Sequence, residues 1–180
     1  IKGMYLCKPG ADGDKRVQLL GSGSILRESI EAQKLLAADW GVQADVWSCP
    51  SFNELTREGQ DVARWNLLHP LEAQRTSFVA QQLGGRPGPV VASTDYMKNY
   101  AEQIRAFIPA GRSYKVLGTD GFGRSDFRSK LREHFEINRH YITVAALKAL
   151  ADDGKLPLAK VAEAIAKYGI KTDKINPLHA

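Results

Sequence analysis

The sequence contains few of the residues that bind metals or cross-link small proteins. Its 180 residues include two cysteines and four histidines. Cys7 and Cys49 lie far apart and belong to no CxxC or Cys/His cluster. This scarcity argues against a disulfide framework and a zinc site, and it favours a reducing compartment. We therefore expect a cytoplasmic protein in which both thiols pack as small apolar side chains.

Long apolar runs and basic runs are also missing. No apolar stretch approaches the roughly 20 residues that a helix needs to cross a membrane, and the chain does not open with a signal-peptide pattern. The net charge is +5, but the 25 Lys and Arg residues are interspersed with 20 Asp and Glu residues. Nucleic-acid-binding proteins usually gather their basic residues on one face. We expect neither a membrane nor a nucleic-acid partner.

Signatures of common active sites are absent as well. The histidines show no HxxH or HExxH spacing, and no serine-nucleophile elbow or Walker-type glycine loop occurs. Residues 21–24 (Gly-Ser-Gly-Ser) supply two of the three glycines of a dinucleotide-binding fingerprint, but Leu26 stands at the third position. A tight strand-to-helix turn with serine capping is the favoured interpretation, and half of a nucleotide site is the alternative.

Short apolar runs alternate with amphipathic segments through the first two thirds of the chain. This alternation predicts a doubly wound α/β sheet. A turn at 9–14 is so short that the first strand should run antiparallel to the next. A short strand or coil is expected at 77–81. The expected strands are 3–7, 16–20, 42–49, 90–93 and 114–118, and the expected helices are 24–40, 51–68 (with a break at Gly59) and a segment from Thr94 or Asp95 to 108.

After residue 118 the alternation stops. The pattern then predicts three helices, at 125–134, 138–152 and from Pro157 to Gly169, followed by a polar tail at 170–180. We expect one domain over residues 1–180, with the extra C-terminal helices closing over the sheet.

The most distinctive stretch is the glycine-rich loop at 115–126, which includes Arg124 and Asp126. Loops at the carboxyl ends of parallel strands are where α/β folds bind ligands. Two interpretations remain: a ligand site, or charges that hold the turn or a domain interface. His69, in the Trp-Asn-Leu-Leu-His-Pro segment, is a candidate packing or interface residue. From the residues alone, this is an α/β domain without a self-sufficient active site.

Four stretches together resemble one family. Residues 18–26, 65–70, 92–98 and 116–126 occur in an order and form that closely resemble the C-terminal domain of the homodimeric pyruvate dehydrogenase decarboxylating component. The Gly-Phe-Gly-Arg-Ser turn is similar to the glycine turn of transketolase C-terminal domains. The resemblance covers residues 4–178 and implies a three-layer α/β/α sandwich with a five-strand, mostly parallel sheet and one antiparallel edge strand.

The resemblance also implies a longer polypeptide, as does the unusual start Ile-Lys-Gly. Enzymes of this family bind thiamine diphosphate and magnesium, decarboxylate pyruvate and pass the acetyl unit to the lipoyl group of dihydrolipoyl acetyltransferase. Their cofactor motif, Gly-Asp-Gly followed by Asn, has no match here. We therefore assign no catalytic, cofactor-binding or metal-binding residue to this segment, and we expect the other domains to hold the cofactor.

The implied role is packing against the preceding domains, assembly of the homodimer and docking of the acetyltransferase. Polar loops at element ends supply the candidate contacts, which are His69, Asp95, Tyr96, Phe122, Arg124 and Asp126. Three alternatives remain open. They are the same domain of a transketolase or another 2-oxo acid dehydrogenase, a free-standing nucleotide-binding or regulatory module, and a pure docking module.

Overall fold

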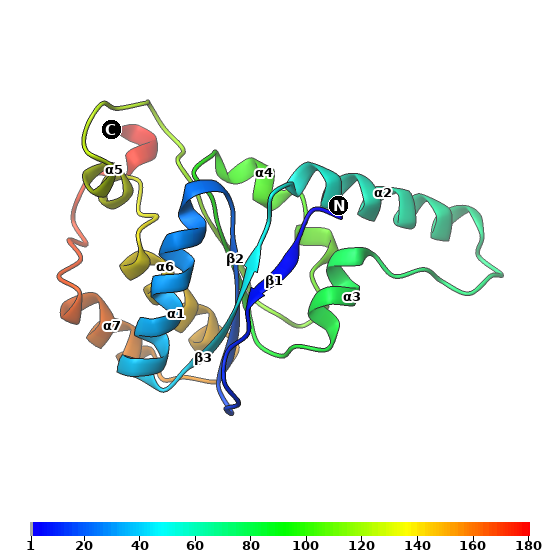
Figure 1. Ribbon diagram of the computed structural model, residues 1–180, viewed down its shortest axis with the longest axis horizontal. Coiled ribbons are helices and arrows are strands. Elements are labelled where there is room, and N and C mark those ends of the chain that lie inside the picture. Colours follow the sequence, from blue (N-terminus) through cyan, green and yellow to red (C-terminus); the bar gives the residue numbers. More distant parts are fainter. Residues whose placement is uncertain (1) are drawn as a thin grey trace.

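The computed structural model describes residues 2–180 and contains one five-strand sheet in the order β1-β3-β2-β4-β5 (Figure 1). β1 pairs antiparallel with β3, and the remaining pairs are parallel. The predicted α/β sheet with one antiparallel edge is confirmed. The first strand runs antiparallel to the second, as expected, although β3 lies between them. The strands are β1 (Tyr5–Lys8), β2 (Arg16–Gly21), β3 (Gln43–Ser48), β4 (Val90–Ser93) and β5 (Tyr114–Leu117).

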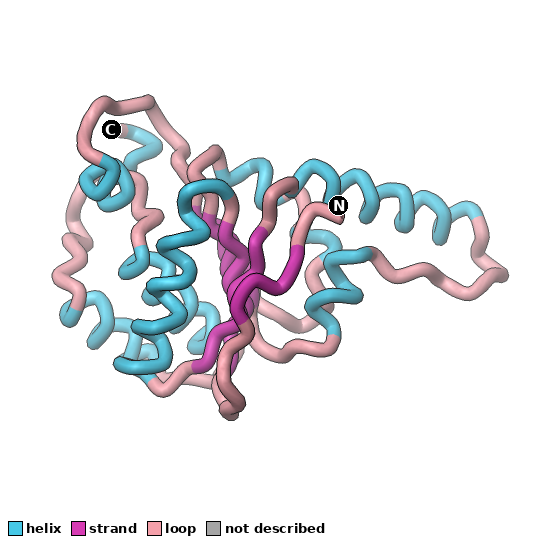
Figure 2. The backbone as a smooth tube through the Cα atoms, in the orientation of Figure 1, coloured by secondary structure: helices cyan, strands magenta, loops and turns pink. Residues whose placement is uncertain are grey.

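Helices cover both faces of the sheet and make three layers (Figure 2). One face carries α1 (Leu26–Trp40), α6 (Arg139–Asp152) and α7 (Leu158–Lys167). The other face carries α2 (Phe52–Leu68), α3 (Phe78–Gly84) and α4 (Lys98–Glu102). The three-layer sandwich implied by the resemblance is therefore present.

The central strand β2 connects the two apolar cores. Val17 and Leu19 pack with the α1 and α6 side, whereas Leu20 packs with the α2 and α3 side. All three side chains are fully buried. Burial on both faces is typical of a parallel strand between helical layers.

Several helix ends follow signals that the sequence contains. Gly41 ends α1 with φ +62°, a left-handed conformation that favours glycine. The Ser51 hydroxyl accepts a hydrogen bond from the Glu54 N–H at the start of α2 (3.2 Å). The Asn138 side chain accepts from the N–H groups of His140 and Tyr141 at the start of α6 (3.0 and 3.2 Å). These caps satisfy donors that the first helical turn leaves unpaired.

Two predictions between residues 51 and 89 were wrong. α2 continues unbroken through Gly59, where an added Cβ would lie 2.4 Å from the ring of Phe107. The glycine therefore serves close packing and does not break the helix. Ser77 begins α3, where a strand or coil was expected, because its hydroxyl accepts from the Ala80 N–H (3.3 Å).

Two helices start later than predicted. α4 begins at Lys98 and is followed by a short 3-10 turn (Arg105–Phe107), so the predicted long helix is two pieces. α5 (Arg128–His134) begins three residues after Ser125. Asp126 delays it by accepting a hydrogen bond from the N–H of Phe127 (2.7 Å), which holds a local turn.

The segment predicted as a tail, 170–180, packs against the rest of the molecule. It contains a 3-10 turn at Pro177–His179, and Pro177 is buried. A Cβ on Gly121 would lie 2.1 Å from the carbonyl oxygen of Pro177, and φ at this glycine is +104°. The glycine thus allows the loop after β5 to lie directly against the C-terminal segment.

The C-terminal half of α2 and the loop that returns from it form an arm, residues 60–77, that projects from the body (Figure 1). Its tip is held by paired bonds between the Asn66 side chain and the backbone of Arg75 (2.8 and 2.9 Å). The Arg75 guanidinium lies over the Trp65 ring, and the His69 ring stacks on the same indole. Leu71, 99% exposed, stands at the tip. Within residues 2–180, no helix is both long enough and apolar enough to span a membrane.

Candidate functional site

The loops that follow β2, β4 and β5 meet at one edge of the sheet. The chain leaves β2 toward α1 on one face and leaves β4 toward α4 on the opposite face, while the two strands are neighbours. This reversal is the position at which open α/β sheets commonly bind ligands. We call this region, comprising residues 21–24, 94–97 and 118–127, the carboxyl edge.

A carboxylate of the chain itself occupies the anion position at this edge. Asp95 Oδ2 accepts a hydrogen bond from the Ser24 N–H (2.8 Å), at the turn that leads into α1. Gly23 has φ +56°, and a Cβ there would lie 2.3 Å from Asp95 Oδ1. Dinucleotide-binding folds place a phosphate against a glycine turn of this kind. Because Asp95 takes that place, the geometry does not favour the nucleotide-binding alternative.

Backbone and side-chain bonds fasten the three loops together. Ser22 N–H donates to Ser93 O (2.9 Å), and the hydroxyls of Ser29 and Ser93 lie 3.0 Å apart. The Thr119 N–H donates to Tyr96 O (3.0 Å). Asp120 Oδ1 accepts from the first N–H of α4 (3.1 Å). These bonds make the inner part of the carboxyl edge a firm platform.

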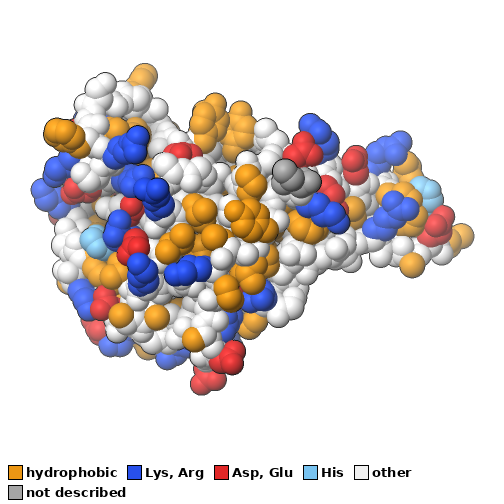
Figure 3. Space-filling view, viewed as in Figure 1, with side chains coloured by type: hydrophobic (Ala, Val, Ile, Leu, Met, Phe, Trp, Pro, Cys, Tyr) orange, Lys and Arg blue, Asp and Glu red, His pale blue; other side chains and the backbone are white. Residues whose placement is uncertain are grey.

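Large apolar side chains project from this platform. Phe122 and Phe127 are 78% and 80% exposed, and Tyr96 and Met97 are about half exposed. Figure 3 shows apolar side chains standing out along the upper margin of the molecule, over the strand ends and α4. Contiguous exposed apolar groups mark surfaces that other proteins or membranes cover. We call these four side chains the apolar rim.

Five of the six predicted contact residues lie at the carboxyl edge, namely Asp95, Tyr96, Phe122, Arg124 and Asp126. Asp95 and Asp126 are committed to local hydrogen bonds, whereas Tyr96, Phe122 and Arg124 point to the surface. His69 lies apart from them on the arm (Figure 1), where its Nδ1 is 2.7 Å from Trp65 O. The structure thus gives His69 a packing role within the arm.

Sequence reasoning missed Met97 and Phe127. Each stands directly before a short helix, Met97 before α4 and Phe127 before α5. The helical period placed Met97 on a buried face, and Phe127 was not singled out. Phe127 carries the clearer signal. It is an isolated aromatic residue between charged and polar neighbours, which is hard to bury in a helix that otherwise reads as polar.

The glycine turn before α1 is not open to the diphosphate of thiamine diphosphate, because Asp95 occupies it. Residues 2–180 bring no three His, Cys, Asp or Glu side chains together as a potential metal site. At the turn before α1, where a phosphate would bind, the Ser24 N–H already donates to the carboxylate of Asp95. No step of cofactor chemistry is therefore assigned to these residues.

Known proteins resemble this chain over nearly its whole length. The chain is 62% identical over 179 residues to the pyruvate dehydrogenase E1 component of Pseudomonas aeruginosa, and this match covers 99% of the chain and 20% of that protein. Identity to the same component is 58% over 180 residues in Cupriavidus necator and 54% over 176 residues in Escherichia coli K12. The chain thus spans about a fifth of the curated relatives it matches.

Solved structures show the same fold at low sequence identity. The transketolase of Pichia stipitis matches with a TM-score of 0.54 and 18% identity, over 86% of this chain and 19% of that one. A split-gene transketolase matches with a TM-score of 0.54 and 18% identity, over 84% of this chain and 43% of that one. The transketolase-like C-terminal domain family matches residues 3–138. The chain belongs to the transketolase-like C-terminal domain family.

Proposed function

We propose that this chain is the C-terminal domain of a pyruvate dehydrogenase E1 component and that it joins the other domains and subunits through the carboxyl edge. The apolar rim carries this proposal. The edge that usually binds ligands is closed by Asp95 and instead presents Phe122 and Phe127 to solvent. A surface of this kind is stabilised by covering it with protein.

The activity that we propose for the complete protein follows from its relatives. Those with 54–62% identity are pyruvate dehydrogenase E1 components, whereas the transketolases are 18% identical and support the fold alone. The complete protein would decarboxylate pyruvate with thiamine diphosphate and magnesium, as a homodimer in the cytoplasm, and acetylate the lipoyl group of dihydrolipoyl acetyltransferase. The two unpaired cysteines, Cys7 and the buried Cys49, suit that compartment.

A chimera tests whether this chain can serve as the C-terminal domain of a pyruvate dehydrogenase E1 component. The C-terminal fifth of the Pseudomonas aeruginosa protein is replaced by this chain, and pyruvate decarboxylation and mass in solution are measured. We expect an active, assembled chimera. A chimera that folds but stays unassembled, or that assembles without decarboxylating pyruvate, would contradict this assignment.

The same chimera tests the apolar rim. Phe122→Ser combined with Phe127→Ser should lower the fraction of assembled enzyme and lower activity in proportion. Leu158→Ser, an exposed leucine on α7 away from the carboxyl edge, is the matched control and should leave both unchanged. Loss of catalysis with unchanged assembly would instead give the rim a direct part in the reaction.

A further inference from the structure

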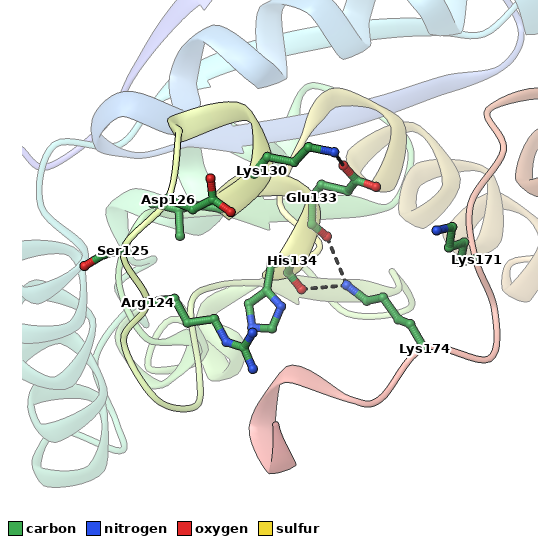
Figure 4. A pocket seen from close by; sticks show the side chains of 9 residues that line it. Arg124, Ser125, Asp126, Lys130, Glu133, His134, Lys171 and Lys174 are labelled. Carbon is green, nitrogen blue, oxygen red and sulfur yellow. Dashed lines mark hydrogen bonds and ion pairs between the residues drawn. The ribbon is translucent and has the colours of Figure 1, made fainter.

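A hollow lies at the outer end of the carboxyl edge, between residues 124–126, α5 and the C-terminal segment. Its volume is about 590 Å³, in the range of pockets that hold small organic ligands. Figure 4 shows Arg124 entering from the loop beside the ring of His134, with Lys174 and Lys171 on the other side. We call this hollow the basic cavity.

Cations exceed carboxylates in its lining. Four cationic side chains face it, and the acidic ones are Asp126 and Glu133. Glu133 is already paired with one of the cations, since its carboxylate lies 3.6 Å from Lys130 Nζ. The cationic side chains are Arg124, Lys130, Lys171 and Lys174.

Two of these cations have no acidic partner in the part of the chain that the structure describes. Within residues 2–180, no ion pair includes Arg124 or Lys171. Lys174 differs, because its Nζ lies 3.3 Å from the Glu136 carboxylate and donates to the carbonyl oxygens of Glu133 (3.0 Å) and His134 (2.6 Å) at the end of α5. Lys174 therefore holds the C-terminal segment in place and shapes the cavity, while Arg124 and Lys171 are available to a ligand.

A buried nitrogen in the same cavity lacks a partner. Among residues 2–180, nothing hydrogen-bonds to the shielded Nε2 atom of His134. Buried polar atoms without partners are rare in folded proteins and call for an explanation. Burial, with Arg124 and Lys174 close by, lowers the pKa of His134 although Glu136 opposes them. The imidazole therefore favours its neutral form in this structure, mainly because it is buried.

We propose that the basic cavity binds a small phosphorylated molecule, with the phosphate oxygens received by Arg124 and Lys171 beside the ring of His134. A guanidinium offers paired donors that match phosphate geometry, and a lysine adds a point charge. The cavity exceeds what one phosphate fills, so the remainder of the ligand lies along α5 and the C-terminal segment. This proposal goes beyond the packing role proposed above and does not depend on it.

The test uses the isotope-labelled 180-residue chain and inorganic pyrophosphate as the probe. Sodium pyrophosphate is titrated at constant ionic strength, and backbone amide shifts and the His134 ring are followed by NMR. We expect saturable shifts confined to residues 118–134 and 171–174. The pKa of His134 should rise on binding, because a nearby anion stabilises the imidazolium.

Three variants sharpen the result. Arg124→Gln and Lys171→Gln should each weaken pyrophosphate binding about tenfold, the loss expected for a hydrogen bond to a charged group. Both side chains are exposed, so an unchanged amide spectrum elsewhere should confirm that the fold is intact. Lys155→Gln, an exposed lysine at the start of the α6–α7 turn, makes the same charge change outside the cavity and should bind as the parent does.

The proposal is overturned if the shifts do not saturate or if Lys155→Gln weakens binding as much as Arg124→Gln. Binding that leaves the His134 pKa unchanged would also overturn it, because the ligand would then sit elsewhere. These outcomes concern the isolated chain and leave the chimera test of the apolar rim unaffected.

Discussion

At the scale of single residues, Asp45 is a buried carboxylate that depends on several hydrogen-bond donors. It is fully buried near the start of β3. Its carboxylate accepts from the Gly10 N–H (2.9 Å) and from the side chains of Arg16 (2.9 Å) and Gln18 (3.0 Å). Burial alone would raise the pKa of Asp45, but these donors and the nearby Arg86 together lower it. The carboxylate thus joins the loop after β1 to β2 and β3.

Asp45→Asn should destabilise the chain by about 3 kcal/mol, the lower end of what breaking a buried ion pair costs. The neutral amide leaves two guanidinium groups without their counter-charge and presents donors to donors. Urea unfolding at pH 7 measures the change. Asp12→Asn, an exposed acid in the same loop, is the control and should stay within about 0.5 kcal/mol of the parent. Equal stability of the two variants would remove the proposed role of Asp45.

The same residue shows what a sequence pattern reveals. An acid between apolar residues of a strand is visible in the sequence, but its partners lie 27 to 41 residues away, on β2 and in two loops. Asp95 is the parallel case at the carboxyl edge. It was predicted either to begin the next helix or to make a domain contact, whereas its carboxylate lies on the turn before α1. Long-range partners of polar side chains are set by the tertiary fold, which local patterns do not contain.

At the scale of elements, Gly59 couples α2 to the 3-10 turn that contains Phe107. Alanine favours a helix over glycine by about 1 kcal/mol. A Cβ at this position, however, would meet the Phe107 ring at 2.4 Å. Overpacking of this kind costs about 1–3 kcal/mol. We therefore expect Gly59→Ala to destabilise the chain by about 1 kcal/mol.

A double-mutant cycle measured by urea unfolding checks this coupling. In a Phe107→Leu background, Gly59→Ala should become neutral or stabilising, because the smaller side chain leaves room. Gly84→Ala, at the end of α3, meets no atom within 4 Å and should stabilise the chain slightly in either background. If Gly59→Ala stabilised the parent as much as it stabilised Phe107→Leu, the ring would not constrain this position.

The elements themselves were largely predictable, for reasons that differ along the chain. Strands and capped helices follow from apolar runs bounded by glycine or by a capping side chain, as at Gly41, Ser51 and Asn138. The segment 94–108 was predicted as one helix because its apolar positions fit a helical period. The structure divides it into α4 and a 3-10 turn. Ser77 was overlooked as a cap because the helix that it begins is only seven residues long.

At the scale of the whole molecule, stability should depend on pH in two steps. Burial, with Arg139 adding to it, lowers the pKa of His140 from 6.5 against the opposing effect of Glu28. A histidine with a lowered pKa contributes stability above the unfolded value, and this is lost as pH falls below about 6.5. Glu28 and Asp45 also have lowered pKa values, so their contribution is lost as pH falls below about 4.5.

Urea unfolding at pH 7, 6 and 5 should therefore show a falling free energy of unfolding, by at most about 1.4 kcal/mol per pH unit for each histidine involved. His140→Gln should flatten this slope. His179→Gln, on the exposed C-terminal turn, should leave it unchanged. His134 contributes in the same pH range, so part of the slope should remain in His140→Gln. A slope as steep as that of the parent would mean that His140 does not link folding to pH.

The position of β2 between the two cores has a consequence for how the chain unfolds. Val17 and Leu19 of this strand belong to one core, and Leu20 belongs to the other. If one layer of helices unfolded, β2 would lose the packing on one face, and the core on its other face would be destabilised. The two halves are thermodynamically inseparable, and heating should produce one calorimetric transition whose van't Hoff and measured enthalpies agree. Two separate transitions would show that the two layers of helices unfold independently.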